Sequence, residues 1–439
     1  MIERPEYVKR LVSAMGNGMV KIITGVRRCG KSYLLSTLFR DRLRDMGVDD
    51  AHVHSASLDL KPYEALQDPN RLYEYFAERI VADGRTHYVF IDEVQLCRKV
   101  LKKGVDPARV APEDTDSLYT TFHDTLNSLA ALPRVDVYVT GSNSRMLSSD
   151  IATQFRGRGM ELRVRPLSFS EFLSVHGGEK ADAWRDYMST GGLPQVVLER
   201  DEAAKRSLLS SLFSKTYLRD VVERHKIKDE VALGRLVDLL CSAVGSLTNP
   251  ARLARSFVSE WKAGPSEPTI RSWLGCLESA FLFQRADRWD VKGGRYLSSP
   301  SKWYATDVGL RNARTNFRQM EPSHLMENLI YNELVGRGHS VDVGVVESVE
   351  AAGGKESHVR REIDFVVNTP FRKLHVQSAF SIPDAEKRRR ETASLRKSGG
   401  FFRKILVTGG NEKPWTDEDG ITTVGVIPFL LDRTFTEGN

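Results

Sequence analysis

The sequence contains few cysteines and no long apolar run. The four cysteines, Cys29, Cys97, Cys241 and Cys276, show neither C-x-x-C nor Cys/His spacing, which argues against a disulfide framework and against a zinc site. No apolar run approaches the roughly 18 to 20 residues that cross a bilayer. The amino-terminal residues also lack the apolar segment of a signal peptide. We therefore expect no membrane contact and a location in the cytoplasm.

A large excess of one charge is also absent. The chain has 64 Lys and Arg residues against 58 Asp and Glu residues, a formal net charge of +6. This balance permits nucleic-acid binding without requiring it. Basic residues do gather at residues 387–404. A phosphate-contacting patch and a solvated helix face are both open interpretations of that stretch.

A phosphate-binding loop is predicted near the amino terminus. Residues 19–24 form a short β-branched apolar run, and residues 33–39 have helical spacing. The pattern G-x-x-x-x-G-K-S lies between them, in Gly25, Val26, Arg27, Arg28, Cys29, Gly30, Lys31 and Ser32. The glycines allow successive backbone N–H groups to face the β-phosphate of ATP. We expect Lys31 to reach the β- and γ-phosphates and the Ser32 hydroxyl to ligate Mg²⁺.

A second motif supplies two neighbouring carboxylates. Residues 87–91 read as an apolar strand that ends in Asp92 and Glu93. Asp92 is placed to hold Mg²⁺ through water, and Glu93 to orient or deprotonate the attacking water. An Asp-Glu pair alone is a weak signal, but downstream of a phosphate-binding loop it predicts ATP hydrolysis.

Further polar residues follow later strands. Ser142 and Asn143 come after the apolar residues 135–140. In a doubly wound parallel α/β sheet they can reach the γ-phosphate or the lytic water, or they can cap the next helix. Arg156 and Arg158 lie in a glycine-containing turn. A guanidinium there suits delivery to a phosphate of the same or a neighbouring subunit, with Arg158 as first choice, and ordinary surface ion pairs are the alternative.

Several motifs together resemble one family. They occupy residues 23–32, 89–95, 140–144, 157–158, 166–172 and 191–194. The sequence is similar to the AAA+-type P-loop ATPases of bacteria and archaea that are usually described only as ATP-binding proteins. This resemblance implies an α/β P-loop fold, an ATP-driven switch or motor, a homo-oligomer, and a C-terminal effector region of uncertain role.

The length of the chain predicts roughly two to four domains. We expect a P-loop ATPase domain at 1–195, a helical bundle at 196–240, a winged-helix-like domain at 241–320 and a restriction-endonuclease-like domain at 321–439. Residues 100–117, rich in charge, proline and glycine, read as an exposed insertion. Arg271, on the expected second helix of the winged-helix-like domain, is a candidate for DNA contact, although such units also bind proteins.

The last region resembles the restriction-endonuclease fold, whose metal site combines a helix carboxylate, an aspartate and a Glu-x-Lys strand. Glu327 and Asp364 match this pattern, but the Glu-x-Lys position reads Gln377, Ser378 and Ala379. The missing carboxylate and lysine predict a catalytically degenerate domain that binds nucleic acid through its basic stretch.

Three functions stay open from the sequence alone. The first is an ATPase whose turnover rearranges C-terminal modules acting on DNA or on a protein partner. The second is a nucleotide-gated binding protein with negligible turnover, and the third is an ATP-coupled nuclease. Glu93 favours the first, because a pure switch needs no carboxylate beside the lytic water. Gln377 and Ala379 oppose the third.

Overall fold

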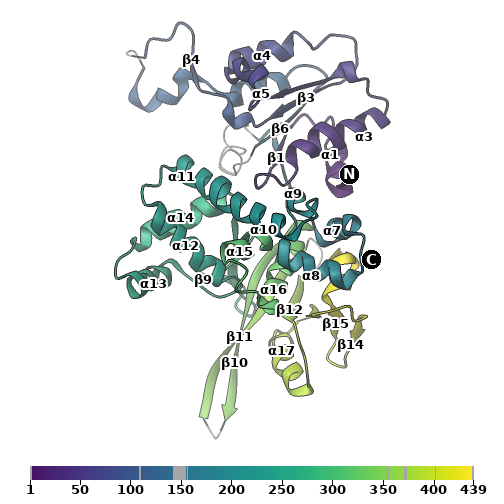
Figure 1. Cartoon of the computed structure of the whole chain (residues 1–439), viewed down its shortest axis with the longest axis vertical. Helices are drawn as coiled ribbons and strands as arrows, with labels where there is room; N and C mark the ends of the chain where they lie inside the picture. Colours follow the sequence, from purple (N-terminus) through teal and green to yellow (C-terminus); the bar gives the residue numbers. More distant parts are fainter. Residues whose placement is uncertain are drawn as a thin grey trace. The chain divides into compact units, whose positions relative to one another are not determined.

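The computed structural model describes residues 2–107, 110–141, 155, 157–352, 355–369, 373–400 and 402–437. They form two compact units (Figure 1). The first comprises Met1–Arg165 with Ser279–Phe281, and the second Pro166–Glu278 with Leu282–Asn439. The sequence predicts an ATPase domain at 1–195, and the main segment of the first unit ends at Arg165. None of the described helices is both long and apolar enough to span a membrane.

A five-stranded parallel sheet forms the centre of the first unit. Its strand order is β2-β3-β6-β1-β7, and every neighbouring pair is parallel. The strands are β1 (Val20–Thr24), β2 (Val53–Ser57), β3 (His87–Asp92), β6 (Val135–Thr140) and β7 (Gly159–Arg163). The expected α/β class is confirmed for this unit. Because β6 lies between β1 and β3, the carboxyl ends of these three strands meet at one edge.

Both faces of this sheet are covered. The helical segments are α1 (Pro5–Ser13), α2 (Lys31–Tyr33), η1 (Leu34–Phe39), α3 (Arg40–Asp45), η2 (Asp50–His52), η3 (Lys61–Gln67), α4 (Pro69–Ala77), η4 (Val94–Leu96), η6 (Pro112–Leu118) and α5 (Phe122–Ala130). On one face, α4 and α5 pack on alternate strand residues such as Val89 and Ile91 (Figure 1). On the other, the Phe39 ring lies 4.9 Å from the Tyr138 ring. Burial on both faces explains why these strands read as continuous apolar runs.

The expected insertion forms a small separate element. A two-stranded antiparallel pair joins β4 (Val100–Leu101) to β5 (Tyr119–Thr120), with η6 between them. Most described residues of this segment are exposed. The composition of residues 100–117 therefore indicated its exposure correctly.

The second unit contains many helical segments besides its sheet. They are α7 (Phe169–His176), α8 (Lys180–Thr190), α9 (Pro194–Val197), α10 (Glu202–Ser211), η7 (Leu212–Leu218), α11 (Arg219–His225), α12 (Glu230–Ser242), α13 (Pro250–Trp261), α14 (Glu267–Ser279), α15 (Val308–Arg314), α16 (Pro322–Gly336), α17 (Ala385–Lys397), α18 (Val426–Leu431) and α19 (Thr434–Glu437). A reciprocal capping box starts α7: Glu171 N donates to Ser168 Oγ, and Ser168 N donates to the Glu171 carboxylate. Helix capping therefore explains the serine and glutamate of the motif at residues 166–172.

The two glycines at 191 and 192 are required by close packing. A Cβ on Gly191 would lie 2.3 Å from Asp307 Oδ1, and a Cβ on Gly192 would lie 2.3 Å from Leu167 O. Gly192 N donates to Asp307 Oδ2 at 2.8 Å. Burial raises the pKa of Asp307 to about 6, while the backbone donors oppose that shift. The G-G-L-P motif therefore holds a buried carboxylate within the second unit.

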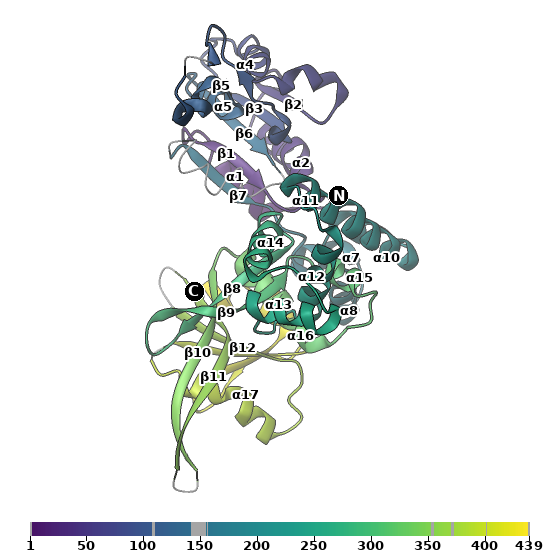
Figure 2. The same ribbon diagram turned by 90° about the vertical axis from the view of Figure 1, so that its left-hand side faces the viewer.

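One mixed sheet of eight strands extends through the second unit. Its order is β14-β15-β13-β12-β11-β10-β8-β9. The strands are β8 (Phe283–Asp290), β9 (Arg295–Ala305), β10 (Ser340–Ala352), β11 (Lys355–Asn368), β12 (Lys373–Ala379), β13 (Arg403–Thr408), β14 (Trp415–Thr416) and β15 (Ile421–Gly425). Parallel pairing of β8 with β10 places strands of the region expected as a winged-helix-like domain in the same sheet as the last region (Figure 2). The two regions expected as separate domains thus share a sheet.

Candidate nucleotide site

The loop after β1 has a backbone that only certain residues can adopt. Gly25 has φ 140°, Arg28 φ 61° and Gly30 φ 96°. A Cβ on Gly25 would lie 2.0 Å from Val164 O, so a larger residue would collide with the backbone after β7. Leu34 N donates to Gly30 O at 2.8 Å, which starts the helix directly after the loop. The first glycine of the motif is therefore needed for a close approach of two backbones.

The middle residues of the loop divide into buried and exposed side chains. Val26 and Cys29 are buried, and Cys29 Sγ lies 3.4 Å from Val164 O. Arg27 and Arg28 are exposed. Packing therefore accounts for Val26 and Cys29, whereas the side chains of the two arginines stay exposed.

Lys31 is held over the backbone of the loop. Its side chain is only 4% exposed, and Nζ donates to Gly25 O at 3.1 Å and to Val26 O at 3.2 Å. These carbonyls belong to the loop whose N–H groups are expected to surround the β-phosphate. The ammonium thus lies beside the position that the motif assigns to phosphate.

Ser32 and Asp92, both predicted Mg²⁺ ligands, are brought together. Ser32 Oγ donates to Asp92 Oδ1 at 3.0 Å. A hydroxyl and a carboxylate are the oxygen ligands that Mg²⁺ prefers, so these residues fit the expected ion. The sequence motif therefore identified two groups that the fold places in direct contact.

Thr140, at the end of β6, links the Asp92 carboxylate to the backbone N–H of Glu93 and was not identified from the sequence. Its hydroxyl donates to Asp92 Oδ1 and accepts a hydrogen bond from Glu93 N at 3.0 Å. The available signal was its position at the end of a strand, directly before the expected polar residues. Its role depends on β6 lying next to β3, which the sequence does not reveal.

Glu93 has an unusual backbone and a perturbed carboxyl group. Its φ is 53°, in the left-handed region that non-glycine residues rarely adopt. Gln95 Nε2 donates to its carboxylate. Burial raises the pKa of Glu93, and Asp92 also raises it, whereas Lys31, Gln95 and Arg27 lower it. A carboxylate with a raised pKa is better suited to accept a proton from water.

Arg4 connects the amino-terminal segment to this loop. Its side chain is 5% exposed, and its Nη1 and Nη2 atoms donate to Cys29 O at 3.2 Å and to Arg165 O at 3.0 Å. The buried guanidinium therefore fixes the loop to the chain after β7. A single arginine before α1 gave no sequence signal for this role.

Arg158 and the phosphate-binding loop lie at opposite ends of the sheet. Its carbonyl accepts a hydrogen bond from Val20 N, and Val20 pairs with Gly159 at the start of both strands. The 5 residues of β1 at about 3.3 Å each place roughly 16 Å between that end and the loop. The exposed Arg158 side chain therefore starts about one strand length away from the phosphate-binding loop of its own chain. The other candidates after β6, Ser142, Asn143 and Arg156, lie outside the described residues.

A second polar cluster lies in the second unit and contains a lysine that the sequence did not indicate. Lys302, on β9, is 3% exposed, and its Nζ lies 2.8 Å from Glu327, 2.6 Å from Glu362 and 3.4 Å from Asp364. Gln377 Nε2 donates to Asp364 Oδ2 at 2.9 Å. The fold does bring Glu327, Asp364 and Gln377 together. Because the ammonium already contacts the three carboxylates, this arrangement does not fit a metal ion beside it.

The cluster is strongly coupled electrostatically. Burial disfavours the charged Lys302, but Glu327, Asp364 and Glu362 outweigh it and raise the pKa of the lysine. Burial and then Glu327 raise the pKa of Asp364 to about 7, against the effect of Lys302. Lys302 is therefore the cation that compensates these carboxylates.

Replacing Lys302 with methionine should strongly destabilise the second unit. Breaking a buried charge pair costs about 3 to 5 kcal/mol, because the partner charges are left uncompensated. Urea or guanidinium unfolding measures this loss. Lys387→Met, which removes an exposed pair with Glu391 at 2.6 Å, should cost only ~0 to 1 kcal/mol. Equal stability of the two variants would show that Lys302 does not compensate the cluster.

The basic stretch of the second unit is partly used within the fold. Arg388, on α17, donates to Asp417 at 2.9 Å and lies over the Trp415 ring, and Arg396 pairs with Asp419 at 2.6 Å. Arg389 and Arg390 are exposed and pair with no other residue in the described part of the chain. Arg271 on α14 pairs with Glu267 at 2.8 Å. DNA contact by these residues, and the winged-helix and nuclease-like assignments, stay predictions.

Comparison with known proteins finds two family models that match parts of the chain. The AAA domain family matches residues 17–173, and a domain of unknown function, DUF8612, matches residues 181–321. An uncharacterized protein of Haemophilus influenzae is 31% identical over 436 residues, covering 98% of this chain and 99% of that protein. Uncharacterized protein MJ1544 of Methanocaldococcus jannaschii is 25% identical over 386 residues, covering 84% and 76%.

Solved structures show more distant likeness. The Walker-type ATPase PABY2304 of Pyrococcus abyssi aligns with a TM-score of 0.46 and 14% identity, over 72% of this chain and 96% of that one. An Orc1 protein of Aeropyrum pernix, solved in complex with DNA, aligns with a TM-score of 0.26 and 10% identity, over 72% and 93%.

Proposed function

This chain belongs to one family with the Haemophilus influenzae protein and carries an AAA-type P-loop domain, and on that premise we propose that it binds ATP with Mg²⁺ and hydrolyses it. The observation that carries this proposal is the contact of Ser32 with Asp92, beside a half-buried Glu93 whose pKa is raised. A domain that only bound nucleotide would not need the Glu93 carboxylate beside the attacking water.

Each group has a defined part in the proposed reaction. Backbone N–H groups of residues 25–32 and the Lys31 ammonium bind the phosphates, and Ser32 with Asp92 holds Mg²⁺. The ion supplies charge neutralisation of the phosphates when bound. Glu93 accepts the proton of the attacking water, and Thr140 keeps Glu93 and Asp92 in register.

Phosphate release from ATP by the purified full chain tests this proposal directly. Release should require Mg²⁺ and stop when EDTA removes it. Tight ATP binding without Mg²⁺-dependent release would instead support the alternative, a nucleotide-gated binding protein. We further propose that the second unit is the effector, that turnover changes its binding to DNA or to a protein partner, and that the chain acts as a homo-oligomer.

Arg158 is proposed to act on the nucleotide of a neighbouring subunit. Its place at the far end of β1, away from the phosphate-binding loop of its own chain, supports this proposal, and its exposed guanidinium suits transfer across an interface. Arg158→Ala should lower turnover about 10³-fold or more, the scale of an arginine supplied in trans. Mixing it with Lys31→Ala protein should restore part of the activity, as measured by phosphate release.

A matched mixture separates this rescue from other effects. Glu93→Gln mixed with Lys31→Ala should give no rescue, because both changes disable the nucleotide site of the subunit that carries them. If the Arg158→Ala mixture also fails to recover while the subunits exchange, Arg158 has no role across an interface.

A further inference from the structure

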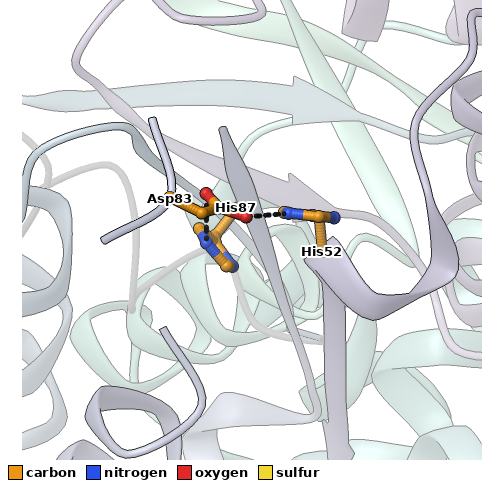
Figure 3. A group of neighbouring side chains, drawn as sticks. All are labelled: His52, Asp83 and His87. Carbon is orange, nitrogen blue, oxygen red and sulfur yellow. Dashed lines mark hydrogen bonds and ion pairs between the residues drawn. The ribbon is translucent and has the colours of Figure 1, made fainter. Parts of the chain in front are cut away.

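Three histidines and an aspartate meet at the amino-terminal edge of the first unit's sheet. His52 ends η2, His54 lies on β2, His87 starts β3, and Asp83 lies in the loop between α4 and β3. Figure 3 shows the Asp83 carboxylate between the rings of His52 and His87. The chain has only 10 histidines in 439 residues, so the meeting of three at one edge is not a consequence of composition.

The distances suit a compact set of metal ligands. Asp83 Oδ2 lies 2.7 Å from His52 Nε2, and Asp83 Oδ1 lies 3.7 Å from His87 Nε2. The three ligand atoms all lie within 4.8 Å of one another. Ligand atoms on tetrahedral Zn²⁺, with bonds of about 2.0 to 2.1 Å, are separated by roughly 3.3 Å. Small side-chain rotations, mainly of Asp83 at 35% exposure, would close the set around an ion.

His54 is placed as an outer partner of one ligand. Its Nε2 lies 3.0 Å from His87 Nδ1, while His87 Nε2 lies 3.0 Å from Val81 O. In the ring as described, the His87 proton belongs on Nε2, facing that carbonyl. With an ion on Nε2, the proton moves to Nδ1 and is donated to His54 Nε2. Metal-ligating histidines usually donate their other N–H to such a partner.

We propose that His52, Asp83 and His87 form a Zn²⁺ site with His54 as its outer-shell partner and solvent as the fourth ligand. Imidazole with one carboxylate is a donor set that suits zinc, and an exposed Asp83 provides access. The site lies at the start of β3, whereas Asp92 is the last residue of that strand and Glu93 follows it. A bound ion would therefore link η2, the α4–β3 loop and β3 at a distance from the phosphate-binding loop. We expect it to raise the free energy of unfolding of the first unit.

Titration of the EDTA-treated full chain with Zn²⁺ tests the site. We expect one Zn²⁺ per chain by calorimetry, and an upward shift of the melting temperature, because an ion bound only by the folded state stabilises it. Asp83→Asn, on an exposed loop, and His87→Ala should abolish that binding. His54→Gln should keep the stoichiometry and weaken affinity about 10- to 100-fold, the usual effect of an outer-shell change.

His176→Ala is the matched control. His176 Nε2 lies 2.9 Å from Asp186 and so forms a His-Asp pair, but it is not part of any described three-ligand group. Binding unchanged in His176→Ala and lost in Asp83→Asn supports the proposal. If the histidine variants do not fold, the visible spectrum of wild-type protein with Co²⁺ decides, with a tetrahedral signature in support. No ion bound by wild type, or binding unchanged in Asp83→Asn, would show that these residues form only a hydrogen-bond network.

Discussion

Glu93→Gln should bind ATP with nearly wild-type affinity and hydrolyse it about 10²-fold or more slowly, the usual scale for losing a positioned base. The amide keeps the shape of the side chain and can still contact Gln95, and the contacts of Lys31, Ser32 and Asp92 are unchanged. What is lost is the capacity to accept a proton. Phosphate release and nucleotide titration on the same preparation measure both quantities.

The pH dependence of turnover gives a second readout of this residue. Burial raises the pKa of Glu93, so its carboxyl stays protonated, and unable to act as a base, to a higher pH than an ordinary glutamate. Wild-type turnover should therefore fall on the acid side with an apparent pKa above the usual range, and Glu93→Gln should lack that decrease. Glu78→Gln, at an exposed site of the same unit, should behave as wild type. A Glu93→Gln rate close to wild type would remove Glu93 from the chemistry.

The parts of the site that the sequence predicted are those carried by local patterns. The phosphate-binding loop lies within one strand–loop–helix segment, and Asp92 ends a strand with Glu93 directly after it. Both faces of the sheet are buried, so its strands are continuous apolar runs that can be recognised one at a time. The contact of Ser32 with Asp92 follows once these strands belong to one parallel sheet.

The parts that the sequence did not predict depend on which strands are neighbours. Thr140 reaches Asp92 only because β6 lies beside β3. Arg158 lies away from the phosphate-binding loop of the same chain because β7 runs parallel to β1 and starts at the same end. Lys302 joins Glu327 and Asp364 because β8 and β9 extend the sheet of β10 and β11. Strand order and register arise from packing of the whole chain, and no short motif encodes them.

Motifs shared with a family also need not be catalytic. The serine and glutamate of residues 166–172 cap α7, and Gly191 with Gly192 admits the buried Asp307. These residues position the helices of the second unit. The first glycine of the phosphate-binding loop likewise has a packing reason, since its backbone approaches Val164 so closely that a Cβ would collide with it.

Lys31→Ala should abolish ATP binding and hydrolysis together. The ammonium is the positive charge that the loop holds next to the expected β- and γ-phosphates, and alanine leaves nothing in its place. Nζ also donates to Gly25 O and Val26 O, so the variant loses contacts that order the loop itself. Nucleotide titration should show no binding at ATP concentrations that saturate wild type, and circular dichroism should show an unchanged fold.

A conservative variant distinguishes charge from loop order. Lys31→Arg retains the positive charge and donors but cannot fit the same buried position, which is 4% exposed. It should therefore recover little of the binding, whereas Lys61→Ala, at an exposed lysine of the same unit, should bind as wild type. Near-normal ATP affinity in a correctly folded Lys31→Ala protein would overturn the assignment of this loop as the phosphate site. Loss of affinity with the fold intact would place the nucleotide at the carboxyl edge of β1, β3 and β6, where Ser32, Asp92 and Glu93 already meet.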